Sequence, residues 1–354
     1  MFNNKNQNMK NLKTLLFGAL VIGSFTACSD DDDNSGDIPQ TADSRTELYA
    51  TNNSNGDVTV YDLENNASFT TITTTSLGAE GVYYDGNGDF LVQASRTPTA
   101  QLQTATDVSL ALSGGSVTLS VNGQVNLATT SPRDIAVSGN FYVVSDSDSD
   151  SFSIYTRDAD GSLSLRNTVE VDFDVWGIEF VGTDLYAVVD TTNEVALFSN
   201  FLASNTVDAS ISATSRVAFE GIVRTHGLAY DGSTMILTDI GAASGEGADT
   251  DGGFHVVTNF TSKFNAAAST AGEGVTGTVA VTDQTRISGA ATNLGNPVAA
   301  EYDAESNTVF IADANNGGGR VLAFASTDVV AGGNVAPTVN NSLSAASSLY
   351  FYKN

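Results

Sequence analysis

The sequence predicts an all-β protein folded as a β-propeller, with six blades and with seven as the alternative. One observation is a short strand closed by a tight turn that occurs five times, at residues 81–86, 134–139, 177–182, 227–232 and 299–304. Another is the absence of any segment with a sustained helical period. Repetition at this interval, built from strands alone, is typical of a propeller.

The strands that follow each repeat complete its blade. A second, apolar run ends each time in a small polar or acidic residue, at residues 90–95, 141–146, 185–190, 234–239 and 308–313. A third strand follows in most copies, at residues 152–155, 195–198 and 320–324. Each copy therefore supplies successive antiparallel strands of one blade.

The first blade lacks its inner strand. Residues 47–52 match the second strands and residues 58–61 the third strands, whereas residues 347–352 at the other end match an inner strand. We expect this C-terminal strand to complete the N-terminal blade, because ring closure removes two exposed sheet edges. Strand-like runs at residues 117–127 and 276–288 keep a seventh blade open.

The first 44 residues are predicted to be targeting and linker sequence. Lys10 and Lys13 precede an apolar stretch at residues 15–25, which has the length of a signal-peptide core and is too short to span a bilayer. We assign residues 1–27 to a lipoprotein signal peptide, 28–44 to an acidic tether and 45–354 to the propeller.

Cys28 is the only cysteine, so it forms no internal disulfide. Residues 25–28 resemble the lipobox of bacterial lipoproteins, and that resemblance implies cleavage before Cys28 and a lipid on its sulfur. A chance cysteine near a simple cleavage site is the alternative. The lipid anchor makes outer-membrane lipid a predicted partner.

An acidic run directly follows this cysteine. Asp30, Asp31, Asp32 and Asp33 resemble the export signal of surface lipoproteins in the Bacteroidetes. The resemblance implies an outer-membrane lipoprotein exposed at the cell surface. A periplasm-facing protein is the alternative, in which the run is only a solvated tether.

The chain is strongly acidic. Its formal charge of −27 falls to −30 once residues 1–27 are removed, because they hold three of the 14 basic residues and no acid. Such a field repels phosphate backbones and excludes a nucleic-acid partner. It favours solubility and cation binding.

Two repeats resemble known propeller families. Residues 48–62 are similar to the YVTN-type repeat, and residues 297–324 to the NHL-type repeat. These families share an architecture and an extracellular bias but no common reaction, so fold alone assigns no activity. We expect a lipid-anchored module that binds an envelope protein or a glycan.

The inner strand of each blade lines the central channel, and its first residue faces the channel mouth. These positions hold candidate ligand-binding residues: Glu80, Arg133, Trp176, His226, Val298 and Ser347. Glycine follows in three blades, which allows a ligand or a neighbouring backbone to approach closely. Mutual pairing, for example of Glu80 with Arg133, is the alternative to ligand binding.

A metal-dependent hydrolase is the competing functional class. Residues 79–82 resemble the segment that supplies a metal-binding glutamate in gluconolactonase-like six-bladed hydrolases, and Glu80 matches that glutamate. The family's Asn and Asp ligands are replaced here by Trp176 and His226. His226 is therefore a candidate ligand beside Glu80, although Ca²⁺ prefers oxygen donors.

Asp146, Asp148 and Asp150 form a second candidate site for Ca²⁺ or another divalent cation, because alternating carboxylates supply oxygen ligands. An ordinary acidic loop is the alternative. The acids that end second strands are interpreted as turn-forming residues. Because no nucleophile elbow, zinc cluster or phosphate-binding loop is present, the sequence favours a binding module over an enzyme.

Overall fold

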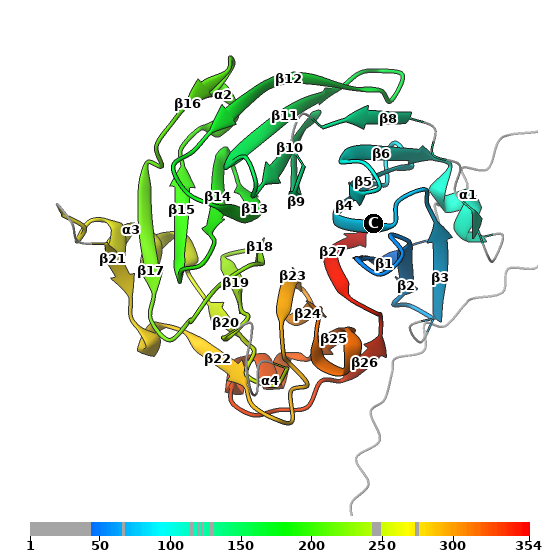
Figure 1. Ribbon diagram of the computed structural model, residues 1–354. Coiled ribbons are helices and arrows are strands. Elements are labelled where there is room, and N and C mark those ends of the chain that lie inside the picture. The colour runs from blue at the N-terminus through cyan, green and yellow to red at the C-terminus, as the bar shows by residue number, and fades with distance from the viewer. Residues whose placement is uncertain are drawn as a thin grey trace, which may run out of the picture. The chain divides into compact units, whose positions relative to one another are not determined.

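Six sheets, each built on four antiparallel strands, surround a central axis in the ring shown in Figure 1. The computed structural model describes residues 44–354 except 66–67, 114–116, 119–120, 122, 128–129, 243–248 and 273–275. Residues 1–43, with Cys28 and the acidic run Asp30, Asp31, Asp32 and Asp33, lie outside the described residues.

Blade 1 is the blade that contains strands from both ends of the propeller, and the strands of each blade are given from the innermost to the outermost. Blade 1 contains β27 (Ala346–Lys353), β1 (Thr46–Asn52), β2 (Val58–Asp62) and β3 (Ser68–Thr73). Blade 2 contains β4 (Gly78–Asp85), β5 (Phe90–Thr97), β6 (Gln101–Thr106) and β8 (Gly123–Asn126). Blade 3 contains β9 (Pro132–Ser138), β10 (Phe141–Asp146), β11 (Ser151–Arg157) and β12 (Leu163–Glu170).

The other three blades follow in chain order. Blade 4 contains β13 (Val175–Val181), β14 (Asp184–Val189), β15 (Glu194–Phe198) and β17 (Ser215–Phe219). Blade 5 contains β18 (Leu228–Asp231), β19 (Thr234–Asp239), β20 (Gly253–Val257) and β22 (Thr285–Ser288). Blade 6 contains β23 (Pro297–Asp303), β24 (Thr308–Asp313), β25 (Arg320–Phe324) and β26 (Val339–Ser342).

Short helices lie between the strands along the chain. They are α1 (Val108–Ser113), α2 (Phe201–Ser204), α3 (Phe260–Ala268), α4 (Ser326–Ala331) and the 3₁₀ turns η1 (Val281–Asp283) and η2 (Asn316–Gly318). None of the helices in the described part of the chain has the length and apolar character needed to cross a bilayer.

The predicted six-bladed ring and its closure are confirmed. Strand β27 pairs antiparallel with β1, with Tyr350 opposite Tyr49 and Phe351 opposite Leu48. The C-terminal strand thereby becomes the inner strand of blade 1, and the C-terminus lies beside β4 in Figure 1.

The seven-blade alternative is wrong, because the two unassigned runs belong to existing blades. Residues 117–127 contain the short β7 (Val117–Thr118) and β8, and residues 276–288 contain β21 (Gly277–Val279) and β22. Strands β8 and β22 are the outer strands of blades 2 and 5. Strands β7 and β21, like β16 (Ala209–Ser210), instead pair in parallel with the outer strand of the preceding blade and link neighbours.

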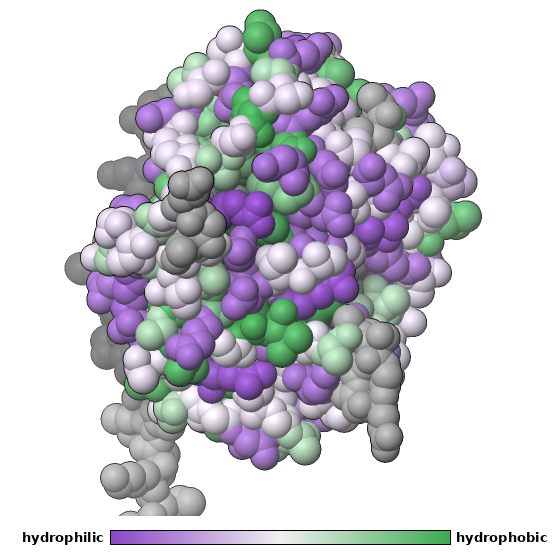
Figure 2. Space-filling view, turned by 60° about the vertical axis from the view of Figure 1, so that its left-hand side comes forward, coloured by the Kyte–Doolittle hydropathy of each residue, from purple (hydrophilic) through white to green (hydrophobic). Residues whose placement is uncertain are grey.

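The core lies between the blades. Each of six clusters of buried hydrophobic residues joins two neighbouring sheets within the described residues; for example, Val188 of β14 and Leu237 of β19 share one cluster. Strands covered on both faces read as continuous apolar runs. On the face drawn in Figure 2, hydrophobic residues form small groups among hydrophilic ones.

Candidate functional site

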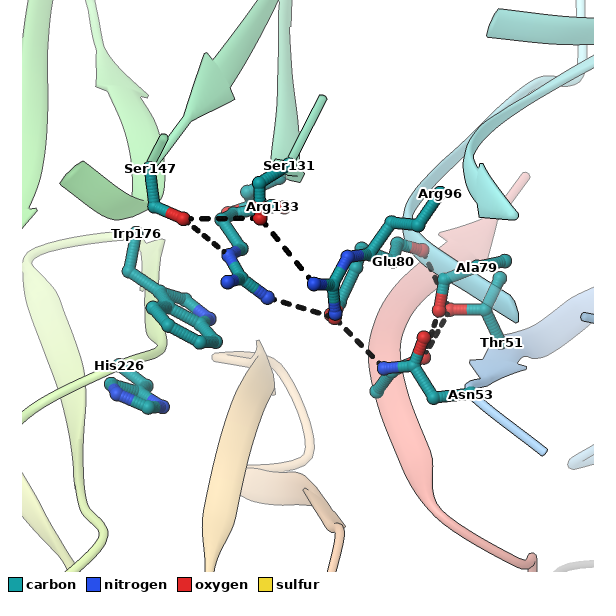
Figure 3. Close-up of polar contacts among 12 residues, drawn as sticks. Thr51, Asn53, Ala79, Glu80, Arg96, Ser131, Arg133, Ser147, Trp176 and His226 are labelled. Atoms are coloured by element: carbon teal, nitrogen blue, oxygen red, sulfur yellow. Dashed lines mark hydrogen bonds and ion pairs between the residues drawn. The ribbon is translucent and has the colours of Figure 1, made fainter. Parts of the chain in front are cut away.

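Four predicted channel residues meet at one mouth of the channel (Figure 3). Glu80, Arg133 and Trp176 lie at the starts of β4, β9 and β13, and His226 lies just before β18. Arg133 Nη1 is 3.4 Å from Glu80 Oε1. Trp176 lies between the Arg133 guanidinium carbon, 3.8 Å from the indole centroid, and the His226 ring, stacked at 3.8 Å and 8°.

Val298 and Ser347, at the equivalent positions of the other two blades, contribute to packing. Val298 is 9% exposed. The Ser347 hydroxyl donates to the Ala79 carbonyl and lies 3.1 Å from the Thr51 hydroxyl, so it ties the closing strand to its neighbours. The polar residues that the inner strands bring to this mouth therefore come from blades 2–5.

Glu80 is held by three donors at one oxygen. Its Oε1 accepts hydrogen bonds from Asn53 Nδ2 at 2.8 Å and Arg96 Nη1 at 3.0 Å, in addition to the Arg133 contact. Burial raises the pKa of Glu80, and the Arg133 and Arg96 guanidiniums oppose that shift. Arg96 lies on β5 and Asn53 directly follows β1, so neither belongs to an inner strand.

Asp190 holds the His226 end of the row formed by Glu80, Arg133, Trp176 and His226. Its Oδ1 lies 3.1 Å from His226 Nε2, and Arg224 binds both carboxylate oxygens, at 2.8 and 2.9 Å. Burial opposes ionisation of Asp190, but the hydrogen bonds from His226 and Arg224 outweigh it and lower its pKa. Burial lowers the pKa of His226, so a neutral imidazole sits against the carboxylate.

The sequence predicted that the four acids at the ends of second strands, Asp146, Asp190, Asp239 and Asp313, hold turns, and the acids other than Asp190 do so. Asp239 Oδ1 accepts from the backbone N–H groups of Val223, Arg224 and Gly241, and Asp313 likewise binds four backbone N–H groups. Asp190 departs from this pattern because its main partners are two side chains.

The candidate cation ligands of the acidic loop have other partners. Asp146 Oδ1 accepts from the backbone of Asp148 and Ser149, and Asp148 Oδ2 accepts from the Thr130 hydroxyl. The pKa of Asp150 is raised, chiefly by desolvation. No three carboxylate, imidazole or thiol groups are grouped for one metal ion among the described residues, those of Glu80 and His226 included. Binding of Ca²⁺ stays a prediction.

The inner strands carry glycine where the backbone of the next blade leaves no room for a side chain. A Cβ on Gly81 would lie 2.7 Å from the Ile135 nitrogen, and one on Gly227 would lie 2.7 Å from the Ala299 Cα. Gly177 donates its N–H to the His226 carbonyl at 2.9 Å. The inner strands thus converge immediately below the mouth.

The mouth gathers arginines in an acidic protein. The chain has nine arginines, and three of them, Arg96, Arg133 and Arg224, are at this site with side chains 31%, 12% and 28% exposed. Glu80 and Asp190 pair with them, and the Asp148 carboxylate also acts on Arg133. Guanidinium groups in this setting bind carboxylates and phosphates and stabilise developing negative charge on oxygen.

A second polar region lies one to three residues further along the same inner strands. There a cavity of about 320 Å³ is lined by Asp134, Glu179 and Glu301, with Tyr83 and Tyr350. The sequence pattern had predicted no role for these acids. The alternation of inner strands could have found Glu179 and Glu301, which occupy equivalent positions two residues after Gly177 and Ala299.

The acidic cavity predicts an unusual dependence of stability on pH. Burial and the nearby Asp134 carboxyl raise the pKa of Glu179 to about 8, from about 4.3 in an unfolded chain. The stabilisation from this protonated group is complete below pH 4.3 and is lost as pH rises through 8. We expect Glu179→Gln to raise the free energy of unfolding by on the order of 1–3 kcal/mol at pH 8.5, and little at pH 5.

Urea unfolding at the two pH values measures this effect. The exposed Glu170 of the outer strand β12 offers the matched control, because Glu170→Gln should change stability equally at both. If the free energy of unfolding changed with pH in the same way for the wild type and Glu179→Gln, the raised pKa of Glu179 would be contradicted.

These features define a six-bladed β-propeller with an arginine-rich polar site at one mouth of its channel. Residues 42–176, under half of the chain, match the family described as "Lactonase, 7-bladed beta-propeller". Comparison with curated proteins gives no match. The family description gives seven blades, whereas this chain forms six.

Two solved structures share the fold. One is a putative 6-phosphogluconolactonase from Bacteroides fragilis NCTC 9343, with a TM-score of 0.57 and 11% identity over 89% of this chain and 99% of that one. The other is a chain of a nidogen/laminin complex, with a TM-score of 0.55 and 13% identity over 86% and 98%. At these identities the likeness concerns architecture alone.

Proposed function

We propose that the protein is a lactonase-like hydrolase that opens a small, hydroxylated ring ester carrying a carboxylate or a phosphate. The observation that carries this proposal is the continuous group from Arg96 and Glu80 through Arg133 to Asp190, which places guanidiniums around a buried carboxylate. The partial match to a lactonase propeller family supports the same class of reaction.

Each member of the group has a distinct task in this mechanism. Arg133 is held rigid by Trp176 and by its 2.8 Å hydrogen bond to Ser147, so it can stabilise the oxyanion that forms on the lactone carbonyl. The more exposed Arg96 and Arg224 bind the anionic group of the substrate.

Glu80 is the proposed general base. Its three hydrogen-bonded contacts all involve Oε1, so Oε2 is assigned to the water proton. Water attacks the carbonyl carbon, its proton passes to Glu80, the ring C–O bond breaks, and the released alkoxide takes the proton back. His226 and Asp190 keep Trp176, and through it Arg133, in place.

A pH-stat assay with sugar lactones tests this activity. The panel contains neutral, carboxylated and phosphorylated lactones. Each lactone is assayed with EDTA-dialysed protein and again with added Ca²⁺ or Zn²⁺. A metal-dependent reaction would lose its turnover on dialysis and regain it when the metal is added. We expect turnover of an anionic lactone that falls at least 100-fold in Glu80→Gln, on the order of 3 kcal/mol. A wild-type rate no higher than that of Glu80→Gln would contradict the proposal.

A second candidate function is favoured by the N-terminal sequence. In it the propeller is anchored to outer-membrane lipid through Cys28, is displayed at the cell surface or faces the periplasm, and binds an envelope protein or glycan. This location is compatible with the hydrolase. Capture from the native envelope by the wild type but not by a mouth variant, without any lactone turnover, would favour the binding module.

Replacement of the cysteine tests the anchor. We expect Cys28→Ser to abolish lipidation and to leave a precursor or misrouted protein, because no other thiol is present. Mass spectrometry of the detergent-extracted protein measures the attached lipid. Neutralising Asp30–Asp33 should reduce protease accessibility on whole cells without affecting lipidation. A Cys28→Ser protein that keeps its lipid mass would contradict the anchor.

A further inference from the structure

The acidic cavity within the channel is a separate feature from the mouth. Asp134 of β9, Glu179 of β13 and Glu301 of β23 come from three blades and line one space of about 320 Å³. Its lining includes no lysine, arginine or histidine. Glu80 and Asp190 at the mouth differ, because arginines pair with both of them.

A second observation is an unpaired hydroxyl on the wall of the cavity. Ser348 of the closing strand is 4% exposed and lines the cavity. Its hydroxyl has no hydrogen-bond partner among the described residues. A ligand in the cavity can therefore donate a hydrogen bond to it or accept one from it.

The cavity suits an organic cation better than a bare metal ion. Its carboxyl groups do not form a cluster of three that could hold one metal among the described residues. Two tyrosine rings, Tyr83 and Tyr350, with centroids 4.6 Å apart, form part of the wall, and aromatic faces attract ammonium groups.

A second hollow borders the cavity at the end of the inner strands. It shares Tyr83 and Tyr350 with the cavity as a common wall and is also lined by Tyr84, Tyr352 and Lys353. The ammonium group of Lys353 is engaged by Glu305 at 2.6 Å.

We infer that this cavity is a binding site for a small organic ammonium compound, held by Glu179 and Glu301 and by the Ser348 hydroxyl. The ammonium group supplies the positive charge that these buried carboxyls lack, and its N–H groups donate to them and to the Ser348 oxygen. Its hydrocarbon part lies against the tyrosines. The site is independent of the proposed hydrolase.

Binding of a cation should release protons from the cavity acids. Desolvation and the Glu80 carboxylate raise the pKa of Asp134 to about 7, and desolvation with the Glu179 and Asp134 carboxyls raises that of Glu301 well above its ordinary value. The ammonium group favours their ionised forms. The titratable groups that line the site are Asp134 of β9, Glu179 of β13, Tyr230 of β18, Glu301 of β23, Tyr83 of β4 and Tyr350 of β27, and Glu80 and Asp231 act on them from nearby.

Calorimetry with matched probes tests the inference. Benzylammonium is titrated into the full chain at pH 8 and pH 5.5, beside benzyl alcohol, which has a similar shape and no charge, and Ca²⁺. We expect benzylammonium to bind with a Kd below about 1 mM at pH 8 and benzyl alcohol at least tenfold more weakly. Affinity for benzylammonium should fall at pH 5.5.

Variants locate the site. The double variant Glu179→Gln, Glu301→Gln should lose at least tenfold in affinity, whereas Glu80→Gln at the mouth and the exposed Glu170→Gln should not. Equal binding of benzyl alcohol, undiminished binding by the double variant, or binding of Ca²⁺ in preference to benzylammonium would each overturn the inference. Should the double variant fail to fold, the wild-type comparison of charged and neutral probes decides the question.

Discussion

Deletion of residues 349–354 is expected to prevent the propeller from folding stably, rather than to fray one end. These residues form most of β27, which is the inner strand of blade 1. Tyr350 and Tyr352 pack against Tyr83 and Tyr84 of blade 2, and Phe351 stacks on Phe310 of blade 6. One segment therefore connects three blades.

The size of this effect follows from what the segment buries. An apolar or aromatic side chain contributes roughly 1.5–3 kcal/mol on burial, and the deletion removes Leu349 and three aromatic residues. Their sum is comparable with the roughly 5–15 kcal/mol stability of a whole domain. The deletion also exposes the edge of β1, which favours aggregation.

Thermal unfolding and size-exclusion chromatography measure the result. The control is deletion of residues 353–354 alone, which removes the exposed end of the strand and keeps its aromatic residues. We expect the short deletion to melt within a few degrees of the wild type and the longer one to be aggregated or unfolded. A folded, monodisperse protein lacking residues 349–354 would refute closure by the C-terminal strand.

Replacement of Arg133 should give the largest loss of activity. Its guanidinium contacts Glu80, Trp176 and Ser147, so Arg133→Gln removes the proposed oxyanion donor and leaves Glu80 with one arginine fewer. Loss of one such donor costs about 10²–10³ in kcat. We expect lactone turnover to fall by at least that factor, with a smaller change in KM because Arg96 and Arg224 remain.

Arg320→Gln is the matched control for this substitution. Arg320 lies on β25 of blade 6, where it contacts Asn316 and Asn340, and is not part of the mouth. Both variants are compared by steady-state kinetics and by melting temperature. An Arg133→Gln enzyme with wild-type kcat would remove this residue from the mechanism.

Much of the fold could be predicted because each inner strand carries the same local pattern. The turn after the inner strand recurs in blades 2–6, and the second strand that follows it is buried over most of its length. The first blade lacks an inner strand at the N-terminal end, which indicated that the C-terminal strand closes the ring. The runs at residues 117–127 and 276–288 suggested a seventh blade because each of them contains a short parallel strand followed by an outer strand. Sequence period alone does not show which sheet a two- or three-residue strand enters.

The candidate site was only partly visible in the sequence. Glu80, Arg133, Trp176 and His226 could be found because equivalent positions of a ring converge in space. Arg96 and Arg224 could not, because they lie outside the inner strands and reach the mouth through long side chains. Asp190 was hidden among strand-ending acids that hold turns, and only its side-chain partners set it apart.

The proposed hydrolase requires that an anionic ring compound bind at the arginine-rich mouth of the channel. A crystal structure of the protein with a phosphorylated sugar acid, the product expected from lactone opening, would locate this binding site. We expect the anionic groups of the ligand to lie within hydrogen-bonding distance of Arg96, Arg133 or Arg224, and its carboxyl carbon to lie near Glu80. A ligand bound elsewhere, or a mouth that stays empty at saturating ligand, would refute binding at this site.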